Sequence, residues 1–261
     1  MTYLEKFGRA QTHMQELDAR LTEWINTPPY RLIGDSQTKG ADGFTTQITR
    51  LEINALVPPE LPLIIGDTLY NFRSCLDHLA YALARTNLGV APRGEKVMFP
   101  IHGAIGSYMV SGVDAVRGMS PAVQGIIERM QPYHRKNGSE THPLAILNKL
   151  SNIDKHRHLA FGFGINEKSS ITPNPKARDV IVEVDGGGIR HGPIENKAEV
   201  FRVRYRETGP NPHVEVDTDF FLDIAFPQDG PAGGQGVIIT LAAIYEHIRT
   251  EVIPTLEKHV W

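Results

Sequence analysis

Two short segments contain the residues whose types and spacing could support catalysis, NFRSCLDH at 71–78 and NIDKHRH at 152–158. In the first segment, Arg73 carries a permanent charge on a planar donor group, and His78 supplies an imidazole. An imidazole can act as a general base or acid, and an arginine can stabilise negative charge on a phosphate oxygen. This segment is therefore a candidate site for acid–base chemistry on an anionic substrate.

Both segments fall in helical patterns, so helix geometry decides which side chains meet. Arg73 and Asp77 are four residues apart and therefore neighbours on one helix face. Arg73 and His78 lie about 140° apart around the axis, so a second helix or a second subunit must complete the site. The predicted catalytic residues are Arg73, His78, Asn71, Asp77 and His156, and the predicted binding residues are Asn152, Lys155 and Arg157.

The first alternative interpretation is structural. A buried polar network could extend from the Arg73–Asp77 pair to Asn152 or Asp154 and lock two helices in register. In that case the same residues stabilise the fold and catalyse nothing.

The second alternative is a metal site in a helical bundle. Its helix-borne candidates are Asp77, His78, Asp154, His156 and His158. Asp154 and His158 have the spacing that zinc and iron ligands use, but Asp77 and His78 diverge by about 100° on a helix. The motifs HEXXH and EXXH are absent. We therefore assign no metal and no cofactor.

Apolar residues at helical spacing predict four long helices that could position these segments, at about 2–26, 62–87, 143–160 and 237–258. Pro28 and Pro29 end the first of them. Ser120 and Pro121 open a shorter helix through Met130, as N-cap and first-turn residues.

Strand patterns occur near 30–34 and 44–54 and again through 161–230, where the character of the chain changes. Arg202, Arg204 and Arg206 alternate with apolar residues in this second part. We expect their strand to pair with the next one, so that Arg204 faces Glu215 and Arg202 faces Asp217. The glycine-rich segments DGGG and GPAGGQG lack the spacing of a phosphate-binding loop and are interpreted as turns.

The composition is that of an ordinary globular protein, with 261 residues, 41% hydrophobic residues and a net charge of -3. The single cysteine, Cys75, permits no internal disulfide, which suits a reducing cytoplasm. No apolar run approaches the roughly 20 residues that span a bilayer. We predict an α+β fold in one domain over 1–261. A bundle of about four long helices would carry a short N-terminal strand pair and a β-rich insertion at about 161–230, before the C-terminal helix.

The string from Arg73 to His78 has the form R-x4-H and resembles the signature of the HEPN superfamily. The later DKHR at 154–157 resembles a phrase found in some HEPN-like sequences, and the wider pattern is similar to a broad family of bacterial proteins of unassigned function. The β-rich segment and the early strand pair depart from a plain HEPN bundle.

The resemblance implies a helical, frequently dimeric protein that cleaves RNA without a metal, as toxins and phage-defence effectors of that superfamily do. It implies catalytic roles for Arg73 and His78, with His156 as a contributor, and RNA and a second copy of the chain as partners. A non-catalytic binding or sensor protein, whose β-rich segment makes the contact, remains the alternative. Exposure of Arg73 and His78 in an open groove would favour catalysis, and burial of both would favour binding.

Overall fold

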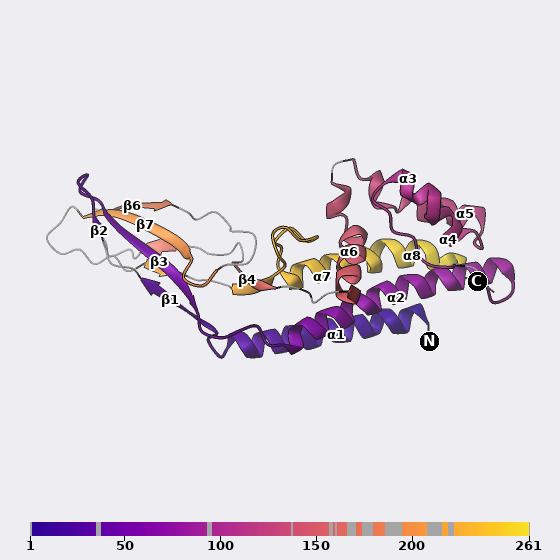
Figure 1. Cartoon of the computed structure of the whole chain (residues 1–261), viewed down its shortest axis with the longest axis horizontal. Coiled ribbons are helices and arrows are strands. Elements are labelled where there is room, and N and C mark those ends of the chain that lie inside the picture. Colours follow the sequence, from indigo (N-terminus) through magenta and orange to yellow (C-terminus); the bar gives the residue numbers. More distant parts are fainter. Residues whose placement is uncertain are drawn as a thin grey trace.

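The computed structural model describes residues 2–34, 38–92, 96–136, 138–156, 159, 161–165, 171–173, 180–185, 195–207, 216–218 and 222–260. These residues form an elongated molecule with a helical body and a β-sheet that projects from one end of it (Figure 1). The mixture of helices and strands confirms the prediction of an α+β protein. Within the described residues, no helix has both the length and the apolar character needed to cross a membrane.

Two long antiparallel helices form the spine of the body, α1 (Tyr3–Ile25) and α2 (Glu60–Leu88) (Figure 1). α1 begins at a capping box, in which the Thr2 hydroxyl accepts a hydrogen bond from the backbone of Glu5 and the Glu5 carboxylate accepts one from the backbone of Thr2. α2 ends at Gly89, whose φ of 70° is the left-handed conformation that glycine adopts without strain. The apolar stripes that predicted these helices face each other in the core.

The other helices lie on one side of this spine. They are α3 (Ile105–Ser107), η1 (Tyr108–Gly112), α4 (Val113–Val116), α5 (Pro121–Arg129), η2 (Pro132–His134), η3 (Ser139–Thr141), α6 (Pro143–His156), α7 (Val237–His247), η4 (Ile248–Val252), α8 (Ile253–Leu256) and η5 (Glu257–His259). α7, η4 and α8 run on from one another as the predicted C-terminal helix. Of these helices, α4, α5, α6, α7, η4 and α8 contribute buried residues to one core with α1 and α2.

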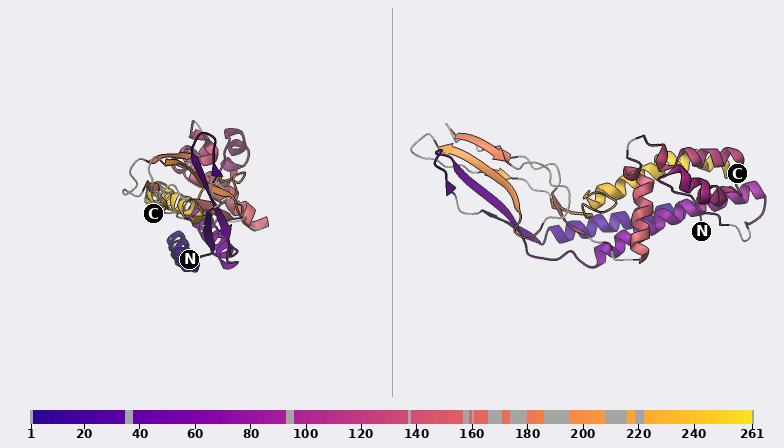
Figure 2. Two further views of the ribbon diagram at one scale, coloured as in Figure 1. Left: turned by 90° about the vertical axis from the view of Figure 1, so that its left-hand side faces the viewer. Right: turned by 45° about the horizontal axis from the view of Figure 1, so that its top comes forward.

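α6 is described from Pro143 to His156 and crosses the long helices steeply, as Figure 1 and Figure 2 both show. The close crossing depends on Gly66 of α2, because a Cβ there would lie 2.6 Å from Oδ1 of Asp154. The described helices therefore do not form the expected bundle of four long ones, since α6 crosses the others.

The early strands and the later β-rich segment belong to one antiparallel sheet. The chain leaves α1, forms β1 (Tyr30–Gly34), β2 (Thr38–Lys39) and β3 (Thr45–Ile53), and then enters α2. β6 (Val180–Asp185) and β7 (Glu199–Glu207) complete the sheet in the order β1-β3-β7-β6, with β2 also pairing with β3. Two further pairs join β4 (Gly162–Ile165) to β9 (Leu222–Ala225) and β5 (Ile171–Pro173) to β8 (Val216–Thr218).

The predicted pairing of the arginine strand with the strand after it is wrong. Asp217 lies on β8, which pairs with β5, and Glu215 is outside the described residues. β7 is an interior strand whose two edges are occupied by β3 and β6, so β8 has no free edge of β7 to join.

The arginines of β7 nevertheless lie beside acidic residues. The Arg202 guanidinium bonds the Glu199 carboxylate at 3.0 Å, and Arg204 bonds Asp42 at 2.7 Å. In the backbone register, Arg202 is opposite Asp185 and Arg204 is opposite Glu183 on β6. Arg202 and Arg204 therefore have acidic neighbours, but these are not the predicted Asp217 and Glu215.

Candidate functional site

Arg73 and Asp77, on the middle of α2, together hold the backbone of Phe99. Arg73 donates from Nη2 to Oδ1 of Asp77 at 2.9 Å and to the Phe99 carbonyl at 2.7 Å. The Phe99 N–H donates in turn to Oδ1 of Asp77 at 3.0 Å. The expected Arg73–Asp77 neighbours are thus an ion pair that fixes the buried Phe99 against α2.

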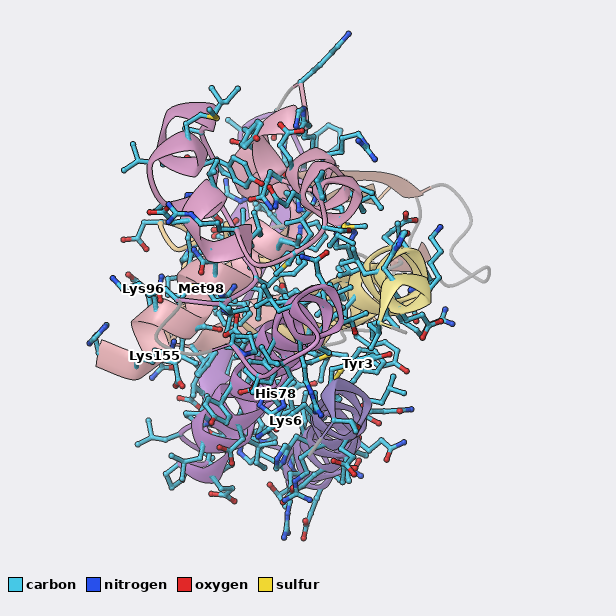
Figure 3. All side chains as sticks on the ribbon, turned by 90° about the vertical axis from the view of Figure 1, so that its right-hand side faces the viewer. Tyr3, Lys6, His78, Lys96, Met98 and Lys155 are labelled. Carbon is cyan, nitrogen blue, oxygen red and sulfur yellow. The ribbon has the colours of Figure 1, made fainter. Side chains whose placement is uncertain are left out.

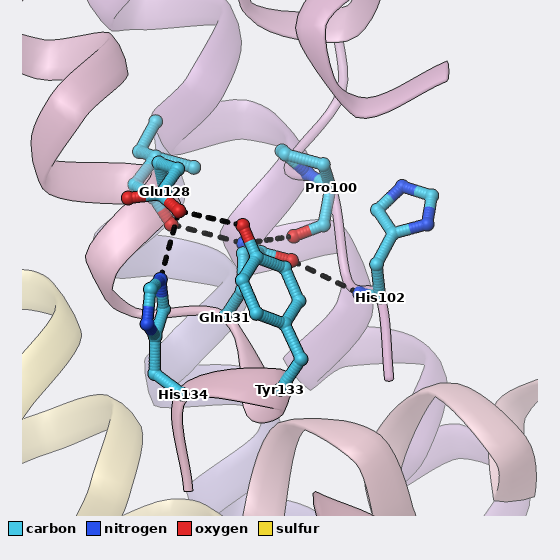
Figure 4. Close-up of polar contacts among 7 residues, drawn as sticks. Pro100, His102, Glu128, Gln131, Tyr133 and His134 are labelled. Carbon is cyan, nitrogen blue, oxygen red and sulfur yellow. Dashed lines mark hydrogen bonds and ion pairs between the residues drawn. The ribbon is translucent and has the colours of Figure 1, made fainter. Parts of the chain in front are cut away.

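Gln131 holds the same extended segment from the side of α5 (Figure 4). Its Nε2 donates to the carbonyls of Pro100 and Ile127 at 2.9 and 3.0 Å, and its Oε1 accepts from the His102 N–H at 2.9 Å. Gln131 is almost fully buried. Side chains from α2 and from the end of α5 therefore fix residues 99–102.

Burial dominates the electrostatics of the Arg73–Asp77 pair. The Arg73 side chain is only 12% exposed, and its Nη1 is buried without a hydrogen-bond partner. Burial lowers the pKa of Arg73, against the attraction of Asp77. Burial also raises the pKa of Asp77, against the effects of Arg73, the Phe99 N–H and Lys155. Arg73 is thus held inside the protein.

His78, the next residue after Asp77, faces a pocket instead. The pocket has a volume of about 980 Å³ and lies between α2, the start of α1, the segment after α2 and the C-terminal end of the helical body. It is lined by Thr2, Tyr3, Leu4, Asp77, His78, Tyr81, Ala82, Arg85, Thr86, Gly89, Val97 and Val260. No hydrogen bond or ion pair joins the His78 ring to another described residue, which leaves its nitrogens available for proton transfer.

Two lysines are placed by their interactions with α2. Lys155 of α6 is close enough to Asp77 to favour its ionised form. The ammonium of Lys6 in α1 lies 5.1 Å from the centre of the Tyr70 ring. Figure 3 labels both lysines, with His78 and Lys96, in a view along the long helices.

The other predicted residues do not join this group. Asn71 is buried, and its Nδ2 donates to the Asp67 carbonyl one turn earlier at 2.8 Å. Asn152 and His156 are exposed on α6, and no hydrogen bond or ion pair joins them to a described residue of α2. Arg157 lies outside the described residues. Among the described residues of the second segment, Lys155 is the one whose charge acts on the Arg73–Asp77 pair.

No set of metal ligands is found in the part of the chain that the structure describes, where no three His, Cys, Asp or Glu side chains are grouped to hold an ion. Asp154 lies against Gly66, and burial together with Asp67 raises its pKa. His158 is outside the described residues.

Sequence reasoning missed the residues that line the pocket beside His78. Tyr81 and Arg85 follow His78 by three and seven residues and therefore share its face of α2. Extending the helical spacing beyond the R-x4-H motif would have found them. Comparisons of the chain with protein-family models, curated proteins and solved structures found no match.

Proposed function

We propose that this chain is a metal-independent endoribonuclease of the HEPN type. The observation that carries the proposal is that His78 lines an open pocket together with the cationic Arg85, next to a fixed ion pair. An imidazole with available nitrogens suits proton transfer, and a cation in the same pocket suits a phosphodiester.

In the proposed reaction, His78 removes the proton from a 2′-hydroxyl, and the resulting oxygen attacks the adjacent phosphorus. The bond to the 5′-oxygen breaks, and this leaving oxygen takes up a proton, so the protonated His78 can return the proton it removed. Cations at the pocket stabilise the charge on the phosphate. Arg73 acts as a positioning residue here, because its Nη2 already binds Asp77 and Phe99.

The proposal extends to the remaining features that the resemblance implies. The chain would be a single HEPN-like helical domain with its β-rich insertion at 161–230 and would work as a homodimer in the cytoplasm. It would need no cofactor, and a toxin or phage-defence effector is the fitting biological role.

A second candidate function is non-catalytic binding, as a sensor or partner module. It is favoured by the position of Arg73, which is 12% exposed and directs its hydrogen bonds to Asp77 and Phe99. On this account the ion pair only stabilises the fold, and His78 is one contact among several in the pocket.

The two functions are separated by an assay of single-stranded RNA cleavage in excess EDTA. The ribonuclease proposal expects cleavage by the wild-type protein, and loss of cleavage in His78→Ala with a nearly unchanged melting temperature. His134→Ala, which removes an exposed imidazole bonded to Glu128, is the control and should remain active. An inactive wild-type dimer would contradict the proposal and leave the binding function.

A further inference from the structure

The floor of the His78 pocket is a single stripe of α2. His78, Tyr81 and Arg85 recur at three- and four-residue steps, so their side chains line the pocket from the same helix face. The stripe continues past the R-x4-H motif toward the end of α2. The pocket therefore contains binding groups that the motif does not include.

Arg85 differs from Arg73 in its surroundings. Arg85 is exposed, and no hydrogen bond or ion pair joins its guanidinium to another described residue. An arginine with no internal partner keeps its planar donor group available for an anion, and phosphate oxygens match that geometry well.

Tyr81 presents an aromatic ring to the same pocket, and the ring is 42% exposed. The opposite walls include the apolar side chains of Leu4, Val97 and Val260. A flat ligand placed between the tyrosine ring and these walls would cover apolar surface that now contacts water. Nucleobases have such a flat face and stack on aromatic side chains in single-stranded RNA complexes.

We infer that Tyr81 and Arg85 form a nucleotide-recognition subsite, in which Tyr81 stacks on a base and Arg85 binds a phosphate of single-stranded RNA. The choice of RNA rests on the proposed ribonuclease function. Arg85 lies two helical turns from His78, about 11 Å along the axis, so it holds a different phosphate of the strand from the one at which His78 acts. An acidic peptide could bind Arg85, but its carboxylates offer no aromatic face to stack on Tyr81.

The test measures binding of a short fluorescent RNA in which every 2′-hydroxyl is methylated, so that no cleavage can occur. The variants are Tyr81→Leu, Tyr81→Phe and Arg85→Gln in the full chain, with Tyr70→Leu and Arg129→Gln as controls at exposed positions outside the pocket. Tyr81→Leu should weaken binding roughly 5- to 150-fold, as expected for the loss of one stacked base, and Tyr81→Phe should bind like the wild type. Arg85→Gln should also lower the salt dependence, by about 0.7 in the log–log slope for one lost phosphate contact.

The outcomes separate this inference from the proposed function. If the pocket variants and the controls all bind the methylated RNA as tightly as the wild type, the subsite is absent. This conclusion holds even if the wild type cleaves unmodified RNA. If the pocket variants lose binding but unmodified RNA is never cleaved, the subsite stands and the ribonuclease function fails. Binding of an acidic peptide in preference to the methylated RNA would overturn the inference. Circular dichroism of each variant shows whether it is folded.

Discussion

At the scale of single residues, α2 contains two arginines, Arg73 and Arg85, whose side chains have different surroundings. Arg73 directs its hydrogen bonds to Asp77 and to the Phe99 backbone, whereas Arg85 lines the pocket and has no hydrogen-bond partner for its guanidinium among the described residues. The difference follows from position along α2, because Phe99 lies against the helix at Arg73 and Asp77, whereas Arg85 lies at the pocket. A buried charge of this kind is costly to leave unpaired.

Arg73→Lys is therefore expected to destabilise the protein. Both hydrogen bonds come from Nη2, and a lysine ends one bond closer to the backbone than this atom, so its ammonium does not take the same position and a buried polar group loses its partner. The expected loss is about 1–3 kcal/mol in the free energy of unfolding, measured by urea denaturation. Arg129→Lys, at an exposed position of α5, is the control and should change little. Equal stability of the two variants would show that the pair does not support the fold.

Some of this site could be predicted from the sequence. The i,i+4 spacing of Arg73 and Asp77 predicted that they are neighbours, and they form an ion pair. Helix geometry also predicted that Arg73 and His78 point in different directions, and His78 lines the pocket instead. The third partner of the pair is a backbone group at Phe99, and a backbone group has no side-chain chemistry to recognise in a sequence. The role of Gln131 was missed for the same reason.

At the scale of elements, the contact between α2 and α6 depends on the lack of a side chain at Gly66. A Cβ there would lie 2.6 Å from Oδ1 and 3.0 Å from Cγ of Asp154. Glycine inside a helix otherwise costs about 1 kcal/mol relative to alanine. Close packing of α6 is the structural reason to have glycine at this position.

Gly66→Ala is expected to lower stability in the wild-type chain and to raise it in an Asp154→Ala chain. In the wild-type chain the added methyl displaces the Asp154 carboxylate and should lower stability. In an Asp154→Ala chain the obstacle is removed, and the same substitution should raise stability by about 0.5–1 kcal/mol through helix propensity. A double-mutant cycle of thermal or urea unfolding measures both. A gain of stability in both chains would mean that the contact between α2 and α6 does not require glycine at position 66.

His142, just before α6, and His247, at the end of α7, form a pair of histidines that responds to pH. The His142 ring accepts a hydrogen bond at Nδ1 from the Leu144 N–H at 3.2 Å, which caps the helix. The ring also packs edge-on against His247, with ring centres 4.8 Å apart. Burial, His247 and Arg135 lower the pKa of His142 to about 4. Burial also lowers the pKa of His247, which Glu251 opposes.

These shifts predict lower stability in mild acid. In the unfolded chain a histidine takes up its proton near pH 6.5, whereas folded His142 resists it down to about 4. The unfolded state therefore binds more protons in this window, and stability falls as the pH is lowered through it.

His142→Asn should flatten that decline, because the amide oxygen can cap α6 but does not titrate. Melting temperatures of both proteins across this range measure the difference. Burial raises the pKa values of Asp77 and Asp154, so these two groups change stability with pH in the opposite direction. They do so in both the wild type and His142→Asn, so the difference between the two proteins reports the effect of replacing His142. If the melting temperatures of the two proteins fall in parallel with pH, the titration of His142 does not cause the decline.

At the scale of the whole molecule, the helical core centres on α2. Leu76 is fully buried among side chains of a core that also includes α1, α6 and α7. Leu76→Ala should therefore cost about 2–5 kcal/mol in the free energy of unfolding, measured in urea. Leu63→Ala, at a position of α2 that is 70% exposed, should cost far less. A loss below about 1 kcal/mol at Leu76 would mean that the core is packed differently.

The helices of this core were predictable because apolar spacing is a local signal. The arrangement of the helices was harder to predict, since the steep crossing of α6 depends on one glycine and one aspartate in different helices. The sheet was the least predictable element. Nothing local in β3 or β7 indicates that they pair with each other.

The pairing of β3 with β7 has a consequence during synthesis. About 150 residues separate the two strands, so at 5–20 residues per second β3 waits roughly 8–30 s for its partner. During this interval β1 and β2 can cover one edge of β3, while the other edge stays open to pairing with another chain. A ribosome that stalls before residue 199 therefore holds a nascent chain with an exposed strand edge. Such chains are expected to depend on chaperones that bind extended segments.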